Sequence, residues 1–464
     1  MIDLGLAVRN LLRNRRRSLA TLLALAIGTA AILLFGGYRK NIEYSMHTGY
    51  VRHGGHLQIQ HRDLYLYGAG NPTQYAISNY KKVMAVLAGD EWLGRHVVVA
   101  TPTLQLGGIA SNASEAVSRT VVGVGVVAAD YTRMRAWNGF DMPQIAPKLA
   151  LDGAPSDAAI VGTGVARVLL LCQPLNIADC PKPLGKSPQV GADMPEDIAR
   201  LTQVVRPGPA VTPAGKVVID LLASGAGGAP NVVSLQVVGA ERQGFKELDE
   251  IYVMLQLAQA QQLIFGRAEP KVTSIVLQLD RSSELATARE RVKMVLNEAA
   301  DGQPLAVLSF TELNPFFEQT VQLFDTIFGF IFVLISSIVL FTVSNTMNTA
   351  VMERTVEIGT LRALGVRRLG VQRLFVMEGL LLGLAGAATG AIFAIAVSAF
   401  INSLGLTWLP PGSGDRLPLL LLVWGETSTI VLTVVGLLTV AGVSAWWPAR
   451  RASRLVIVDA LRHA

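Results

Sequence analysis

Residues 353–373 read ERTVEIGTLRALGVRRLGVQR, a charged stretch of good helix formers that separates two long apolar runs. A stretch with this charge density cannot be embedded in lipid, whereas an apolar run of about 20 residues can cross a hydrocarbon core of about 30 Å. The charged stretch is therefore predicted to lie on one face of a membrane, with a membrane span on either side. This arrangement defines the chain as a membrane protein.

Four apolar segments are long enough to span a membrane, and the arginines beside them set the topology. Hydrophobic residues make up 51% of the 464 residues and charged residues 16%, against about 25% in soluble domains. Arginines cluster within 9–17, 354–373 and 450–454, and with four spans all three clusters fall on one side. Basic residues are enriched in cytoplasmic loops, so this side is predicted to be the cytoplasm.

Both ends of the chain are then cytoplasmic, and one large domain lies outside. The apolar stretch 417–424 is interrupted by Pro418 and followed by Glu426, so we interpret it as an interfacial or re-entrant segment. The predicted parts are an amphipathic cytoplasmic N-terminal helix (1–17), spans at 18–38, 326–352, 374–403 and 426–447, an extracytoplasmic domain ending in a stalk helix (39–325), a cytoplasmic helix region (353–373), an extracytoplasmic loop (404–425) and a cytoplasmic tail (448–464).

The extracytoplasmic segment is long enough for one large or two smaller folded domains. β-Branched and alternating runs alternate along it with helical patterns, so we expect an α+β domain. The predicted strands include 56–60, 97–100, 120–127, 231–238 and 272–279, and the predicted helices include 78–88, 257–265 and 282–300.

The two cysteines of the chain, Cys172 and Cys180, both fall in this domain. Outside the cytoplasm two nearby cysteines can form a disulfide, which we predict here, with two unrelated thiols as the alternative. Four histidines, at 47, 53, 56 and 61, have the spacing of no compact zinc motif, and no metal site is predicted.

No catalytic constellation stands out in the sequence. The stretch 208–216 resembles a phosphate-binding loop superficially, but Val217 stands where a Ser or Thr would hold magnesium. The carboxylates Glu378 and Glu426 lie near predicted membrane boundaries, unlike those that a self-contained ion-coupled carrier places inside its spans. The basic residues flank apolar runs and form no basic face, so nucleic acid is not an expected partner.

Two features of the spans and their connection predict contacts. Gly379, Gly383, Gly386 and Gly390 form a small-residue face on the third span, suited to close helix packing within the chain or across a dimer. In 353–364 the apolar side chains share one face of a short helix, which Gly365 ends. Such a helix can float on lipid or seat its apolar side in a groove of a soluble partner.

The residues around this helix resemble a known family. The stretches 353–365 and 380–390, the C-terminal Pro448-Ala-Arg-Arg-Ala-Ser-Arg454 with Asp459-Ala-Leu-Arg462, and the arginine-rich residues 7–17 are similar to the FtsX-like, or MacB-type, permeases of ABC transporters. The resemblance is specific from Phe317 onward, fair over the first 60 residues and diffuse between them. Residues 455–458 depart from the family by lacking a proline, and we expect no nucleotide-binding domain to be fused to this chain.

The resemblance implies a non-catalytic permease that works by mechanotransmission. It implies a homo- or heterodimer of such permeases in the inner membrane of a bacterial cell, in contact with membrane lipids and two cytoplasmic ATPase subunits. The chain itself would hold no cofactor, since the ATPase binds ATP and Mg. The residues expected to contact the ATPase, above all Glu357 and Arg362, are Glu353, Arg354, Glu357, Ile358, Leu361, Arg362 and Leu364.

The cargo is less well defined than the family. Residues 54–59 are similar to the lipoprotein-releasing permeases, so lipoprotein release or export is the leading expectation. Efflux or peptide export with a periplasmic adaptor is an alternative, as is a membrane signalling or scaffold protein that controls a cell-wall hydrolase. An extracytoplasmic enzyme with a membrane anchor has the least support, because no nucleophile and base are visible together.

Overall fold

The computed structural model describes residues 5, 7, 9, 10, 13, 15–143, 147–177, 216–243, 246–408 and 416–454. Cys180, residues 208–215 of the phosphate-loop-like stretch and residues 459–462 lie outside these ranges. The chain divides into two compact units. We call them the helical unit (1–45, 316–408 and 417–464) and the sheet unit (46–315 and 409–416).

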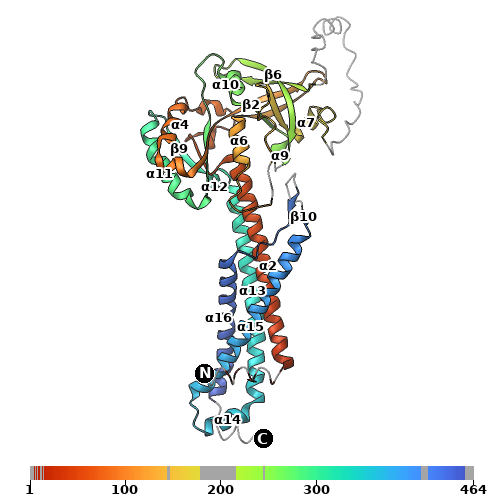
Figure 1. Cartoon of the computed structure of the whole chain (residues 1–464), viewed down its shortest axis with the longest axis vertical. Coiled ribbons are helices and arrows are strands. Elements are labelled where there is room, and N and C mark those ends of the chain that lie inside the picture. The colour runs from red at the N-terminus through yellow and green to blue at the C-terminus, as the bar shows by residue number, and fades with distance from the viewer. Residues whose placement is uncertain are drawn as a thin grey trace. The chain divides into compact units, whose positions relative to one another are not determined.

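Four helices of the described chain are long and apolar enough to cross a membrane. They pack around a shared apolar cluster, to which α2 gives Leu25 and Ile32, α13 gives Val339 and α16 gives Leu437. Figure 1 shows the helices running alongside one another, with the short helix α14 at one end. The four long helices are α2 (Arg15–Gly54), α13 (Pro315–Glu353), α15 (Arg368–Ser403) and α16 (Thr427–Ser453), and the short helix is α14 (Thr355–Ala363).

Two helix boundaries differ from those expected. Helix α2 continues to Gly54, well past the predicted span, because no proline interrupts it. Helix α15 begins at Arg368, inside the region 353–373 that was predicted to be cytoplasmic, and continues without a break into the predicted span 374–403. Nothing between Arg368 and the apolar run breaks a helix, and the actual break is at Gly365.

Between α15 and α16 the described residues include a small antiparallel pair of strands, β10 (Thr407–Trp408) and β11 (Leu417–Pro418). Residues 419–426, which follow β11, form no helix and lead to the N-terminus of α16. The Asn402 side chain donates to the Leu421 carbonyl at 3.1 Å and accepts from the Leu421 N–H at 2.8 Å. The Leu422 N–H donates to the Gly37 carbonyl of α2 at 3.2 Å. This segment therefore lies against the helices without forming a span.

The sheet unit contains one nine-stranded sheet in the order β3-β7-β4-β6-β5-β2-β8-β1-β9. Strands β3 and β2 also pair, so six of the strands close into a ring. The long strand β2 makes this possible, because residues 97–103 pair with β8 and residues 104–112 pair with β3. The strands are β1 (Leu57–His61), β2 (Val97–Asn112), β3 (Val117–Val126), β4 (Ala158–Gly162), β5 (Val218–Ser224), β6 (Pro230–Glu241), β7 (Tyr252–Gln256), β8 (Ser274–Leu279) and β9 (Leu305–Ser309).

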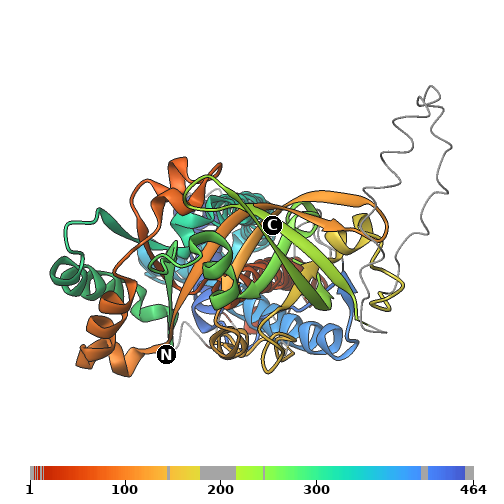
Figure 2. The same ribbon diagram turned by 90° about the horizontal axis from the view of Figure 1, so that it is seen from above.

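Helices cover this sheet in two groups, one beside the ring and one beside the remaining strands. Helix α10 packs against strands of the ring, whereas α4, α5 and α11 pack together near β2 and β9. In Figure 2 the second group lies at one side of the strands and the ring at the other. The helices, including short 3₁₀ turns, are α3 (Leu64–Tyr67), η1 (Pro72–Tyr75), α4 (Tyr80–Gly89), α5 (Glu91–His96), α6 (Ala128–Arg135), α7 (Thr163–Val168), α9 (Lys246–Asp249), α10 (Leu257–Phe265), η2 (Ser282–Glu284), α11 (Leu285–Ala299) and α12 (Phe310–Leu313).

Candidate functional site

Helix α14 is set apart from the spanning helices on both sides. Arg354 precedes it with φ −109° and ψ 22°, outside helical geometry, and bends the chain away from α13. Gly365 follows it with φ +94°, a left-handed conformation that glycine adopts without strain. Arg367 is then extended before α15 begins. We call α14 and the residues that contact it the α14 end of the helical unit.

A buried ion pair lies at the start of α14. The Arg354 guanidinium donates through Nη1 to both carboxylate oxygens of Glu378, at 3.0 and 3.2 Å. Arg354 is 5% exposed and Glu378 is 1% exposed. The Asn10 side chain donates to Glu378 Oε1 at 2.6 Å, and Arg354 Nη2 donates to the Asn10 carbonyl at 3.0 Å. Buried charges are costly unless paired and hydrogen-bonded, and here each charge has several partners.

Two further ion pairs surround α14 at its surface. Arg13 contacts Glu357 at 2.6 Å, and Arg17 contacts Glu353 at 3.0 Å. The first pair is about half exposed on both sides, so water weakens it. These pairs connect α14 and the end of α13 to the N-terminal residues.

The inner side of α14 packs against α15 and α16. Ile358 is buried in a cluster with Phe375 of α15 and Ala449 of α16. Arg362 Nη1 donates to the Ser453 carbonyl of α16 at 3.1 Å. Helix α14 is thus connected to the N-terminal residues, to α15 and to α16.

The α14 end also exposes large apolar side chains. Leu364 is 78% exposed and Met352 is 69% exposed, and Val356 and Leu369 are exposed as well. Charged residues lie among them, with Glu353 and Glu357 also exposed. An apolar surface edged by charges is suited to binding a protein partner.

The residues expected to contact an ATPase divide into three groups in the structure. Glu353, Glu357 and Leu364 are exposed, and Leu361 and Arg362 are partly buried. Arg354 and Ile358 are buried within the chain and do not form part of its surface. The contact role of the exposed residues stays a prediction.

Sequence reasoning missed the roles of Glu378 and Asn10. Glu378 stood out only as a carboxylate near a span boundary, and nothing pointed to Arg354 as its partner. The available signal was chemical, because a carboxylate within an apolar run needs a cationic or hydrogen-bonding partner.

The glycines of α15 make close contacts with two other helices. A Cβ on Gly379 or Gly383 would lie 2.4 or 2.8 Å from the Cβ of Ala445 or Ala441 on α16. A Cβ on Gly386 would lie 2.4 Å from the Leu25 Cβ, and Gly390 similarly faces the Ala26 carbonyl of α2. The structure therefore places this small-residue face inside the chain.

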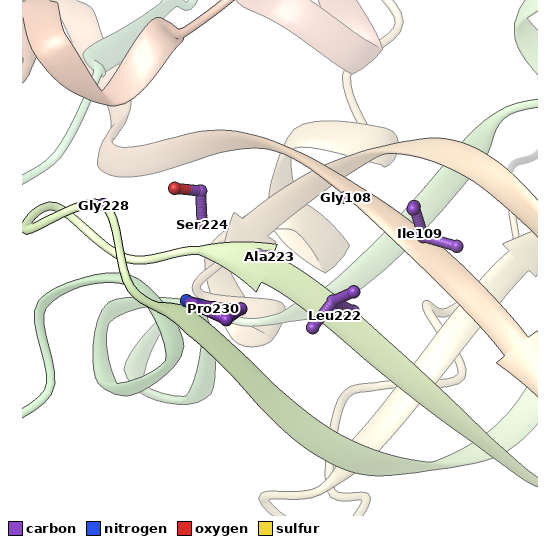
Figure 3. A pocket seen from close by; sticks show the side chains of 7 residues that line it. All are labelled: Gly108, Ile109, Leu222, Ala223, Ser224, Gly228 and Pro230. Atoms are coloured by element: carbon purple, nitrogen blue, oxygen red, sulfur yellow. The ribbon is translucent and has the colours of Figure 1, made fainter.

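The described residues of the sheet unit include one small surface hollow. A hollow of about 250 Å³ lies over β2 and β5 and is lined by Ile109, Leu222 and Ala223, with Ser224 as its one side chain bearing a polar atom (Figure 3). Among the described residues no group of three or more His, Cys, Asp or Glu could hold a metal. The hollow therefore provides apolar surface and no evident chemistry.

His56 has a structural role in the sheet unit. Burial, followed by the nearby His47, lowers the pKa of His56 to about 3, so its ring is neutral at physiological pH. Its Nδ1 accepts from the Leu279 N–H at 3.0 Å, which leaves the proton on Nε2, 2.9 Å from Ser282 Oγ. The ring therefore stabilises the fold as a neutral hydrogen-bonding group.

The fold is that of a membrane protein with four spanning helices and a large α+β domain between the first and second. Two families match this chain: the MacB-like periplasmic core domain over residues 18–295 and the FtsX-like permease C-terminal over residues 327–457. The first match alone covers more than half of the chain. The chain belongs to the FtsX-like, MacB-type family of ABC transporter permeases, and the sheet unit is its extracytoplasmic domain. The predicted family and fold class are confirmed.

Individual relatives match over parts of their length. ABC transporter permease YtrF of Bacillus subtilis (strain 168) is 34% identical over 38% of this chain and 40% of the relative. The lipoprotein-releasing system transmembrane protein LolC of Neisseria meningitidis is 26% identical over 58% of this chain and 61% of its own. The macrolide export ATP-binding/permease protein MacB of Escherichia coli (strain K12) is 36% identical over 31% of this chain and 20% of the relative. The chain spans about half the length or less of most curated relatives that it matches.

Proposed function

We propose that this chain is the permease subunit of an ABC transporter that works by mechanotransmission. A separate cytoplasmic ATPase binds the α14 end, and its ATP-driven movement reaches the extracytoplasmic domain without cargo passing through a membrane channel. ATP and Mg are bound by the ATPase, and this chain catalyses no reaction. The protein lies in the bacterial inner membrane with both termini in the cytoplasm.

The observation that carries this proposal is the composition of the α14 end. Exposed apolar side chains there, chiefly Leu364 just after α14 and Met352 at the end of α13, lie near the exposed carboxylates of Glu353 and Glu357. The inner side of α14 is connected to α15, α16 and the N-terminal residues. A helix that is exposed on one side and packed on the other is suited to bind a soluble partner and to transmit that partner's movement to the helices behind it.

Two continuous helices are suited to relay that push. Helix α2 runs unbroken from Arg15 to Gly54, and α13 runs from Pro315 to Glu353. Each contains one predicted span and continues beyond it. A continuous helix is stiff, because hydrogen bonds between successive turns hold its backbone together, so a displacement at one end reaches the other.

The exposed face of α13 supports a second copy of the chain, or a paralogue, as a further partner. Asn345 and Asn348 are exposed on this helix within a predicted span, beside the exposed Phe341. Amide side chains facing lipid are unfavourable, whereas they bond well across a helix interface. A cysteine at Asn348 should therefore crosslink two chains in the membrane, and a cysteine at Ile392 on α15, also exposed, should not.

For the cargo we propose lipoprotein release or export. The match to a lipoprotein-releasing system protein covers 58% of this chain, whereas the match to a macrolide export protein covers 31%. Efflux with a periplasmic adaptor is the second candidate. Proteoliposomes that hold the permease, its ATPase and a labelled lipoprotein should release the lipoprotein on ATP addition. ATP-driven export of a small molecule alone would favour the second candidate.

The test of the coupling role is to purify the complex with and without a change at Leu364. Leu364→Asp should reduce the amount of co-purified ABC ATPase by roughly tenfold, as expected for loss of a central apolar contact. The matched control is Leu404→Asp, which alters an exposed leucine just after α15. If the wild-type chain brings down no ABC ATPase, or if both variants retain it equally, the proposal is wrong.

A further inference from the structure

The network of Arg354, Glu378 and Asn10 has properties that a partner-binding surface does not need. Its two charges are almost fully buried, so they cannot touch an ATPase directly. Its three residues come from the bend between α13 and α14, from α15 and from the N-terminal segment. The network therefore joins three parts of the helical unit at one point.

The chemistry of the network fixes the relative orientation of the joined elements, which apolar packing alone would not do. Apolar side chains of similar size would hold these elements together without removing two charges from water. A guanidinium is a planar fork, and here Nη1 bonds Glu378 while Nη2 bonds the Asn10 carbonyl. Such bonds are lost on small rotations, whereas apolar packing tolerates sliding.

The location of Arg354 makes a fixed orientation of α14 important. The residue is at the bend between α13 and α14, where its backbone leaves helical geometry. Without a restraint, a force on α14 would be absorbed by further bending at this residue. The network is the buried charged restraint at this bend, and it acts beside the packing of Ile358 against Phe375 and Ala449.

We propose that Arg354, Glu378 and Asn10 form a joint that makes α14, α15 and the N-terminal segment move as one piece when α14 is displaced. These are positioning residues for the coupling of ATP hydrolysis to movement, and none of them contacts the ATPase. The inference rests on the proposed function. It adds that the force passes into α15 and the N-terminal segment at this point, and is not lost in bending at Arg354.

The first experiment tests the joint without an ATPase. Hydrogen–deuterium exchange is measured on the full chain in lipid nanodiscs for the wild type, Glu378→Gln and Glu43→Gln. Glu43 is the matched control, because it is a carboxylate in local pairs within α2. Glu378→Gln should raise exchange at 355–363 by about ten- to a hundredfold, as expected for loss of charge-assisted hydrogen bonds. Exchange at 430–445 should not change.

A double variant separates the joint from a merely structural role. Arg354→Met combined with Glu378→Leu removes both charges together, so folding and insertion should be retained. If the network only holds the fold together, this variant will couple normally. The joint predicts that the ATPase still binds and hydrolyses ATP, while cargo movement per ATP falls about tenfold or more.

The outcomes distinguish this inference from the proposed function. Normal exchange at 355–363 in Glu378→Gln, or normal cargo movement per ATP in the double variant, would overturn the joint and leave the transporter assignment intact. Failure of the wild-type chain to bind an ATPase would overturn the assignment first. Should Glu378→Gln fail to insert, Asn10→Ala removes only the amide bond to Glu378 and should give a smaller rise in exchange at 355–363, of about five- to tenfold, whose absence would overturn the joint.

Discussion

The two ends of the helical unit are held together in different ways. At the α14 end, side chains pair with side chains, as in Arg354 with Glu378 and Arg13 with Glu357. At the opposite end of α15, which we call the β10–β11 end, side chains also bind the backbone of a non-helical segment, as in Asn402 with Leu421.

This difference separates a part suited to movement from a part suited to staying in place. Side-chain pairs hold a helix that keeps its own backbone bonds and can shift as a rigid body. At the β10–β11 end the amide of Asn402 and the carbonyl of Gly37 satisfy backbone groups of a non-helical segment, which would otherwise lack partners beside membrane helices. The Tyr44 hydroxyl donating to Glu426 at 2.6 Å, and the pair of Arg39 with Asp325, add further restraints in this half of the unit.

The largest expected effect comes from breaking the buried pair at the α14 end. Arg354→Met leaves the Glu378 carboxylate buried without its cation, which costs about 3–5 kcal/mol in comparable sites. Thermal unfolding in detergent should show a marked fall in stability. Glu43→Gln should change it little, and equal effects of the two variants would contradict the contrast between buried and local pairs.

Close packing between α15 and α2 should give the next largest effect. Gly386→Ala places a Cβ 2.4 Å from the Leu25 Cβ, so the helices must separate at a cost of about 1–3 kcal/mol. Gly329→Ala on α13 is the matched control, because a Cβ there meets nothing within 4 Å. Unfolding in detergent measures both, and a tolerated Gly386→Ala would show that the two helices are less closely packed.

At the β10–β11 end a smaller and more local effect is expected. Asn402→Ala removes both side-chain bonds to Leu421 and should destabilise the non-helical residues 419–425 by about 1–3 kcal/mol. Faster hydrogen–deuterium exchange at 419–425 would report it. Ser403→Ala is the control, since the Ser403 hydroxyl bonds only the Phe400 carbonyl of its own helix. Unchanged exchange in Asn402→Ala would mean that other contacts hold the segment.

The surface pair of Arg13 with Glu357 should have the smallest effect on stability. Both side chains are at least half exposed, so Arg13→Ala should cost no more than about 1 kcal/mol and less at high salt. The measurement is unfolding at low and high ionic strength. A loss as large as that of Arg354→Met would show that exposure does not separate the two kinds of pair.

The sequence predicted the helical framework better than the contacts within it. Gly365 was identified as the end of a helix, and residues 257–265 match α10, because these signals are local. The continuation of α2 to Gly54 was missed, since polar residues after a span say nothing about where a helix ends. Arg354 was read as a surface charge, because its partner Glu378 lies on the next helix and only the fold brings them together.

The exposed leucines at the two ends of the helical unit allow the most direct test of the central claim. A photo-crosslinking residue is placed at Leu364, which is 78% exposed at the α14 end, or at Leu404, which is 53% exposed at the β10–β11 end. After irradiation of whole cells, mass spectrometry identifies the captured proteins. The account predicts an ABC ATPase subunit crosslinked at Leu364 and absent at Leu404. No ATPase at Leu364, or equal capture at both positions, would contradict it.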